Sequence, residues 1–265
     1  MIVPDPIAFT AFGLEVRWYG VLIASALLIG LFIAIKRAPK YGIDPEIIMD
    51  FFLYMTPAVI IGARLYYVIF SLDYYVAHPD EIIATWHGGL AIHGGIIAGV
   101  IVALILCRVK KISFFALADV LIPALPLGQA IGRWGNFLNQ EAYGSQTDLP
   151  WAITVNDAAL GIIKVHPTFL YESVWNVLIF GFLFFYEDKI KKVDGELLFV
   201  YLGLYSVGRF FIEGLRTDSL MFMGLRTAQL ISLALVVVGI GGLWYLRKNE
   251  ERFTNSLTKK ITKRK

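Results

Sequence analysis

Residues 90–107 read LAIHGGIIAGVIVALILC, and this stretch decides the fold. His93 is its only ionisable side chain. A helix that crosses a membrane needs about 20 consecutive apolar residues. The stretch therefore predicts a transmembrane helix. The whole chain of 265 residues supports this reading, because 57% of it is hydrophobic and only 17% is charged.

Six further apolar stretches of similar length flank the first, and the seven together cover residues 18–35, 51–70, 90–107, 114–132, 169–186, 197–212 and 225–246. The fourth is the least regular, because Asp119, Pro123 and Pro126 interrupt it. Neighbouring helices can satisfy the backbone groups that such prolines free. We therefore predict an all-α integral membrane protein, with residues 1–265 as a single polytopic domain of seven transmembrane helices.

The basic residues predict how this domain is oriented. Most of the 24 lysines and arginines lie in four clusters, which follow the first, third, fifth and seventh stretches. Because Lys and Arg collect in cytoplasmic loops, the N-terminus is expected outside and the C-terminus in the cytoplasm. A basic cytoplasmic tail is expected at about 247–265. An outer loop region is expected at about 134–168, with residues 149–155 extended.

Seven basic residues fall outside these clusters, on the predicted outer side: Arg17, Arg64, Arg133, Lys164, Arg209, Arg216 and Arg226. Topology does not require them, and all but one are arginine. The planar guanidinium group is suited to bidentate binding of phosphate. Snorkelling to the interface and pairing between helices are the alternative, above all for Arg17 and Arg226 at segment ends.

Polar residues gather where the fourth stretch ends, in residues 132–144, GRWGNFLNQEAYG. Ionisable groups at membrane depth are costly and by default mark a functional site. His93 is a second candidate, because the glycines around it leave room for a substrate. A histidine satisfied within the core is the alternative reading of that residue.

Further polar groups occur at other predicted span ends, in residues 17–20, 166–172 and 208–218. Arg209 and Glu213 are four residues apart and Glu213 and Arg216 three apart, so each pair can meet on one helix face. All these groups fall at predicted outer ends of different spans. We therefore expect them to converge on one site near the outer leaflet.

The run 132–144 resembles the signature of the bacterial prolipoprotein diacylglyceryl transferases. That pattern is Gly-Arg-x-Gly-Asn-Phe-apolar-Asn-x-Glu-x-x-Gly, and the chain matches it at each fixed position. Residues 17–20, 88–95, 166–172 and 205–218 look like further motifs of the family. One departure is Phe169, where the family usually has glutamine, which leaves a polar role at that position unsupported.

The resemblance implies an enzyme of the bacterial cytoplasmic (inner) membrane with its active site toward the outer leaflet. It would transfer the diacylglyceryl group of phosphatidylglycerol to the lipobox cysteine of a prolipoprotein, in the first step of lipoprotein maturation. The product is a thioether and the leaving group is glycerol phosphate. The expected partners are phosphatidylglycerol, prolipoprotein signal peptides with a lipobox cysteine, and membrane lipids. No nucleic acid, metal or other cofactor is expected.

Arg133 and Arg209 are expected to grip the phosphate, and His93 is the preferred base for the thiol, with Glu141 or Glu172 as rivals. The predicted substrate-binding residues are Arg133, Tyr19, Asn136, Asn139, Glu141, Gly144, Tyr171, Glu172, Tyr205, Glu213 and Arg216.

Two other classes of protein stay open at this point. A transporter for an anionic solute also needs arginines and broken helices, although its site would lie nearer the bilayer midplane. An intramembrane serine hydrolase would use Ser206, but the spacing of the glycines around that residue differs from Gly-x-Ser-x-Gly.

Overall fold

The computed structural model describes residues 5–11, 13–157 and 159–253. The chain forms two compact units, one of Met1–Ile33 with Ala118–Lys265 and one of Ala34–Leu117. Most of the predicted basic tail lies outside the described residues.

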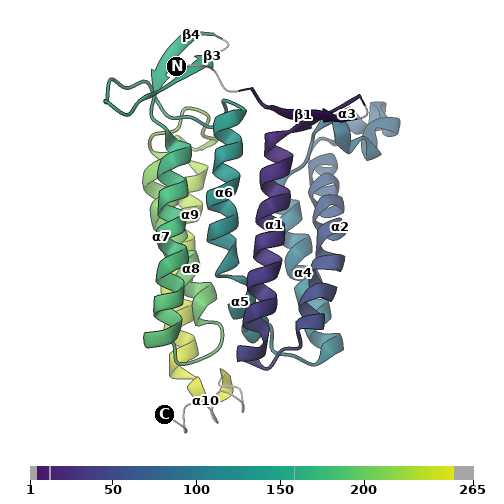
Figure 1. Cartoon of the computed structure of the whole chain (residues 1–265), viewed down its shortest axis with the longest axis vertical. Helices are drawn as coiled ribbons and strands as arrows, with labels where there is room; N and C mark the ends of the chain where they lie inside the picture. The colour runs from purple at the N-terminus through teal and green to yellow at the C-terminus, as the bar shows by residue number, and fades with distance from the viewer. Residues whose placement is uncertain (1–4, 12, 158, 254–265) are drawn as a thin grey trace. The chain divides into compact units, whose positions relative to one another are not determined.

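The first unit is built from long helices (Figure 1). It contains α6 (Ala124–Leu138), α7 (Thr168–Lys189), α8 (Glu196–Glu213), α9 (Thr227–Lys248) and the short α10 (Glu250–Phe253), with most of α1 (Trp18–Arg37) and the end of α5 (Phe114–Leu121). Helix α7 packs between α6 and α8, and α8 packs along α9. Large apolar and aromatic side chains from α7 and α8 fill the core: Ile179, Leu183, Tyr186, Leu197, Val200 and Tyr201.

The interruption expected in the fourth apolar stretch is present. Helices α5 and α6 meet at a bend of 40°, with Pro123 at the N-cap of α6. Pro126 falls in the first turn of α6 and does not break it, because the N–H groups of a first turn have no helical partner. Helix α6 continues to Leu138 and so carries the first half of the signature run.

Buried charges tie together the helix ends of the first unit that lie farthest from this run. Asp119 is fully buried and accepts hydrogen bonds from the backbone N–H groups of Gly195 and Leu197 at 2.7 and 3.1 Å. Lys191 pairs with Asp119 at 3.2 Å. Burial opposes the charge of Lys191, but neighbouring carboxylates outweigh it and raise its pKa. Asp119 therefore fixes the turn into α8 and does more than interrupt an apolar stretch.

Among the described residues of the first unit there are three short antiparallel hairpins: β1 (Ile7–Ala11) with β2 (Leu14–Arg17), β3 (Ile153–Asp157) with β4 (Gly161–Val165), and β5 (Met221–Phe222) with β6 (Leu225–Arg226). Strand β3 overlaps the stretch expected to be extended. The Tyr143 hydroxyl donates to Asp157 at 2.6 Å, and this hydrogen bond lowers the pKa of Asp157.

The second unit pairs α2 (Pro45–Ile69) with α4 (Ile92–Lys110), joined by α3 (Leu72–Ala77) and the 3₁₀ turns η2 (Pro79–Ile83) and η3 (Thr85–His87); a further turn, η1 (Ala38–Tyr41), precedes α2. The two helices touch backbone to backbone. A Cβ atom on Gly62 would lie 2.7 Å from the Gly94 carbonyl oxygen, and one on Gly94 would lie 2.2 Å from that of Gly62. The glycines around His93 therefore serve helix packing within the chain.

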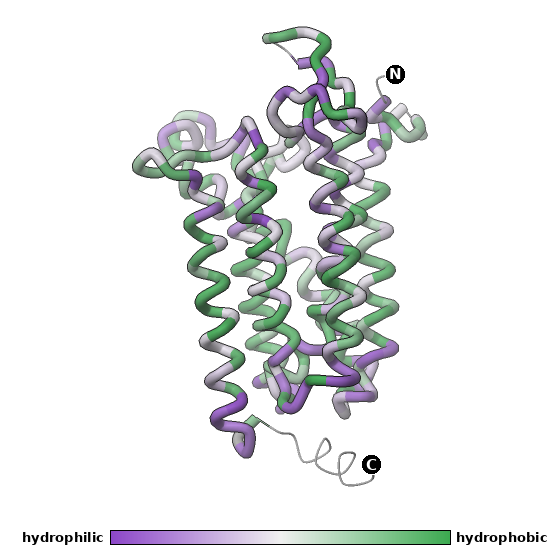
Figure 2. The backbone as a smooth tube through the Cα atoms, turned by 90° about the vertical axis from the view of Figure 1, so that its left-hand side faces the viewer, coloured by the Kyte–Doolittle hydropathy of each residue, from purple (hydrophilic) through white to green (hydrophobic). Residues whose placement is uncertain are grey.

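Five helical segments of the described residues are long and apolar enough to cross a membrane: Trp18–Tyr41, Pro45–Ile69, Ile92–Lys110, Thr168–Lys189 and Thr227–Lys248. The bent pair α5 and α6 makes six. Helix α8 occupies the sixth predicted stretch but misses this criterion, because its 18 residues include Glu196, Arg209 and Glu213. Figure 2 shows hydrophobic residues along the helices and hydrophilic residues gathered near their ends.

Candidate active site

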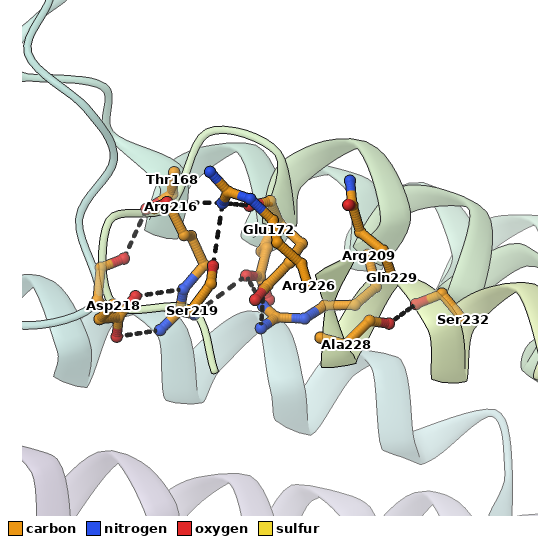
Figure 3. Close-up of polar contacts among 12 residues, drawn as sticks. Thr168, Glu172, Arg209, Arg216, Asp218, Ser219, Arg226, Ala228, Gln229 and Ser232 are labelled. Atoms are coloured by element: carbon orange, nitrogen blue, oxygen red, sulfur yellow. Dashed lines mark hydrogen bonds and ion pairs between the residues drawn. The ribbon is translucent and has the colours of Figure 1, made fainter. Parts of the chain in front are cut away.

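The candidate site lies at one end of the first unit, where α6 and α8 finish and α7 and α9 begin (Figures 1 and 3). Antiparallel packing of α6, α7 and α8 brings residues from distant parts of the chain to this end. We call five of them the arginine–glutamate cluster: Arg133, Glu172, Arg209, Glu213 and Arg216.

Glu172 is the centre of this cluster. Its side chain is 5% exposed and meets Arg133 at 2.5 Å and Arg209 at 2.7 Å, one arginine on each carboxylate oxygen. Arg216 approaches the same carboxylate at 3.8 Å. A buried carboxylate keeps its charge only when it is paired. Glu172 thus holds the arginines of α6 and α8 side by side.

Arg209 is held on a second side by Glu213, the partner four residues further along α8. This pairing confirms the contact expected from the spacing. The ion pair expected between Glu213 and Arg216 is replaced by an ion pair between Arg216 and Asp218. Arg216 donates from Nε and Nη2 to the two carboxylate oxygens of Asp218, at 2.9 and 2.6 Å. This bidentate pair lowers the pKa of the Asp218 carboxyl group.

A chain of side-chain hydrogen bonds links Arg133 to the rest of the signature. Its Nη1 donates to Asn136 at 3.1 Å, and the Asn136 amide donates to Glu141 at 2.8 Å. The Asn139 amide also points to Glu141, at 3.4 Å. The backbone turns sharply here, with positive φ at Gln140 (52°) and Ala142 (58°). Such left-handed non-glycine residues are strained and cluster at functional sites.

Gly144 joins the loop after the signature to two other loops. Its N–H donates to the His166 carbonyl at 3.0 Å, and it forms an isolated bridge with Arg216. A Cβ atom here would lie 2.7 Å from the Cβ of His166 and 3.1 Å from the Leu215 carbonyl oxygen. Only glycine permits this close approach of the three loops.

The glycines of α6 form its contact with α1. A Cβ atom on Gly135 would lie 2.4 Å from the ring of Tyr19, and one on Gly132 would lie 3.5 Å from Ile23. Tyr19 therefore packs beside the signature helix, with its side chain partly exposed. Phe169 stacks on Phe137 with ring centroids 4.6 Å apart, so this departure from the family pattern belongs to an aromatic contact.

The model of the prolipoprotein diacylglyceryl transferase family matches residues 6–245. This chain belongs to that family. It is similar to curated proteins named phosphatidylglycerol–prolipoprotein diacylglyceryl transferase. Identity is 48% with the relative from Finegoldia magna (89% of this chain, 93% of the relative) and 47% with that from Clostridioides difficile (93% and 97%). It is 48% with the relative from Listeria welshimeri (98% and 97%).

Some of the residues predicted for the site lie outside the arginine–glutamate cluster. Tyr171 accepts a hydrogen bond from the Trp151 indole at 2.8 Å and lies 3.3 Å from His166, so it supports the loop before α7. Tyr205 stacks on Tyr201, one turn along α8 from Arg209. Ser206 is 1% exposed, so its hydroxyl is not presented as the nucleophile of a serine hydrolase.

His93 belongs to the second unit, in the first turn of α4. Its side chain is exposed, and its ring lies 5.9 Å from that of Tyr66. The sequence suggested that Arg64, which belongs to the same unit, could bind phosphate. Its guanidinium group is instead occupied by the backbone. It donates to the backbone carbonyls of Glu81, Ile82, Gly88 and Gly89 at 2.6–3.0 Å. Arg64 therefore anchors the loop that precedes His93.

Arg226 has a different role from the snorkelling anchor that its place at the end of a segment suggested. Instead of snorkelling, its Nη1 donates inward to the carbonyls of Glu213 and Arg216, the latter at 2.7 Å, and to the Ser219 hydroxyl at 3.0 Å (Figure 3). It closes the loop that carries Arg216. A basic residue just before a span is the only sequence signal for this role, and topology explains that signal equally well.

Proposed function

We propose that this protein transfers the diacylglyceryl group of phosphatidylglycerol to the lipobox cysteine of a prolipoprotein. The thiol sulfur forms a bond to the carbon of the diacylated glycerol that carries the phosphate, and the bond from that carbon to the phosphate oxygen breaks. The bonding electrons leave with the oxygen, so glycerol phosphate departs. The thiol proton goes to a base, because the thiolate is the nucleophile.

The observation that carries this proposal is the arrangement of Arg133 and Arg209 on Glu172. The two guanidinium groups come from different helices and are oriented by carboxylates, yet their side chains keep 22% and 18% exposure. A guanidinium group has five N–H donors, so these contacts leave others free for a phosphate. Donors fixed in advance stabilise the charge that develops on a leaving phosphate.

The same contacts narrow the choice of base. Glu172 is buried among three arginines, and both of its carboxylate oxygens already face guanidinium groups. Glu172 therefore orients the arginines of the cluster. His93 stays the preferred base and Glu141, whose side chain is exposed and bound by two amides, is the rival.

In the proposed membrane arrangement the seven helical segments span the bacterial inner membrane. The N-terminus is outside and the cluster faces the outer leaflet. Helix α8 can take part although it is the most polar segment, because Arg209 and Glu213 pair with each other and Glu196 pairs with Arg247 of α9 at 3.0 Å. Paired charges within a helical bundle are tolerated at membrane depth.

The direct test uses purified protein, phosphatidylglycerol in detergent and a peptide that contains a lipobox. We expect the peptide to gain the mass of one diacylglyceryl group while glycerol phosphate appears in equal amount. A peptide with serine in place of the cysteine is the control and should stay unmodified. A folded protein that yields neither product would contradict the proposal.

A further inference from the structure

An exposed apolar hairpin lies beside the arginine–glutamate cluster. It consists of residues 220–225, LMFMGL, between α8 and α9. Five of its six residues carry large apolar side chains that are more than half exposed: Leu220 (78%), Met221 (60%), Phe222 (60%), Met223 (87%) and Leu225 (57%). Contiguous exposed apolar groups outside the spans mark an interaction surface.

The turn of this hairpin carries a residue that its backbone does not favour. Strands β5 and β6 are joined by two residues, Met223 and Gly224, with φ of 49° and 79°. Two positive φ angles define a type I′ turn, in which Asn, Asp or Gly is favoured at both positions. Met223 is instead a strained and highly exposed methionine, which points to a binding role for its side chain.

The hairpin is tied to the loop that positions Arg216. The Thr227 N–H donates to the Leu220 carbonyl at 2.9 Å across its base. Arg226, the last residue of β6, bonds the carbonyl of Arg216 and the hydroxyl of Ser219. A molecule held on the hairpin is therefore held at a fixed place relative to the cluster.

We propose that the hairpin docks the apolar segment of the signal peptide next to the lipobox cysteine, an inference that rests on the proposed function. Methionine is flexible and polarisable, and surfaces rich in it accept partners of varied shape. A transferase that modifies many precursors needs such tolerance. Met221 and Met223 are two of the five methionines in the whole chain.

The composition favours a peptide over a membrane as the occupant. Segments that anchor in a membrane interface carry Trp, Tyr, Lys or Arg, and residues 217–225 contain none of these. Arg226, which follows the hairpin, donates inward to backbone carbonyls of the loop instead of outward to a head group. An apolar peptide segment needs no such charged anchor.

The test compares Met223→Asn and Phe222→Ser with wild type, in assays that vary the lipobox peptide and phosphatidylglycerol separately. Asparagine favours the turn, so Met223→Asn should fold at least as well as wild type. Each variant removes an apolar side chain that the bound peptide would cover, and this loss should raise the KM for the peptide about tenfold. The KM for phosphatidylglycerol should not change. Ile162→Ser, which removes a side chain 77% exposed on β4, is the matched control and should alter neither value.

A photoreactive residue at position 222 gives a second measurement that needs no turnover. It should crosslink to the lipobox peptide without any donor lipid, and a peptide with a polar segment should compete poorly. Unchanged peptide KM in both variants, or crosslinking to lipid alone, would overturn the docking role. If wild type crosslinks the peptide but never modifies it, the proposed function fails while the docking surface stands.

Discussion

At the scale of single residues, the site depends on which nitrogen atoms of each arginine are used. Arg133 and Arg209 each bind two partners through two different terminal nitrogens. Lysine has one nitrogen and cannot hold both partners while it also faces a phosphate. We expect Arg133→Lys and Arg209→Lys to lower kcat about 10²–10³-fold, as loss of a donor to developing charge does.

Arg226→Lys is the matched control for these two variants. All three contacts of Arg226 come from Nη1, so a lysine ammonium group can replace them. Steady-state turnover of folded, detergent-solubilised protein should therefore stay near wild type in this variant. Near-normal turnover in Arg133→Lys and Arg209→Lys would remove the phosphate-gripping role and leave both arginines as structural partners of Glu172.

The second prediction at this scale concerns the base. A positioned base contributes about 10²–10⁴-fold to a rate, so we expect His93→Gln to lose activity in that range. His78→Gln is the comparison, because the His78 ring stacks on Tyr74 and lies 3.1 Å from the Tyr74 carbonyl oxygen, within its own loop. Single-turnover rates with saturating lipid measure both. If the two variants lose equally little, Glu141 becomes the leading candidate.

Side-chain partners could be predicted only where helix geometry fixes them. The pairing of Arg209 with Glu213 follows from a spacing of four residues. The partners of Arg64 and Arg226 are backbone carbonyls of loops. Every residue has a carbonyl, so no sequence pattern distinguishes such an acceptor. An arginine that binds phosphate and one that anchors a loop therefore look the same in the sequence.

At the scale of elements, Gly144 connects three loops at the site. The extra carbon of Gly144→Ala would fall within 3.1 Å of His166, Thr168 and Leu215. Overpacking of this kind costs about 1–3 kcal/mol, so we expect a lower Tm and reduced activity. Gly181→Ala on α7 is the control, because nothing lies within 4 Å of its added carbon. Equal Tm values for the two variants would show that the junction can relax.

The loop that carries Arg216 should depend on pH through Asp218. The Arg216 guanidinium holds the pKa of Asp218 below its ordinary value of about 3.9. The pair therefore stabilises the loop at pH values above that value, and the stabilisation is lost as the pH falls through the lowered pKa. The protection of residues 214–226 against hydrogen exchange, taken relative to the intrinsic rate at each pH, should fall at acidic pH. Asp218→Asn should exchange quickly already at pH 7, and slow exchange in that variant would show that other contacts hold the loop.

Hydropathy predicted each long helix, because each carries a continuous apolar surface that must be kept from water. The hydropathy pattern did not predict where the helices end. Helix α6 continues through Trp134 and Phe137, although the polar residues there suggested a loop. Hydropathy also failed to predict most of the hairpins, whose strands have only two to five residues. Turn geometry and backbone pairing hold strands of this length together. The hairpin at residues 220–225 even carries methionine where a turn residue would have signalled it.

At the scale of the whole molecule, the number of spans depends on α8. Five segments meet the criterion for a span alone and the bent pair α5 and α6 adds a sixth. Helix α8 lies between α7 and α9 in the chain and packs against both. If α8 did not cross, α7 and α9 would have to run in opposite directions through the membrane. Both helices instead begin beside the end of α8, where Glu172 of α7 meets Arg209 and Gln229 of α9 donates to the Phe210 carbonyl. They therefore run in the same direction, and we expect α8 to cross between them as one of seven spans.

Cysteine labelling of intact cells tests this topology. Asp148→Cys lies between α6 and α7, and Lys189→Cys lies at the end of α7; both side chains are exposed. The background carries Cys107→Ser, since Cys107 is the only native cysteine and is buried. A reagent that cannot cross membranes should label position 148 from outside and position 189 only after lysis. Because α7 alone separates the two positions, labelling of both from outside would mean that α7 does not span, and the seven-span arrangement would fail with it.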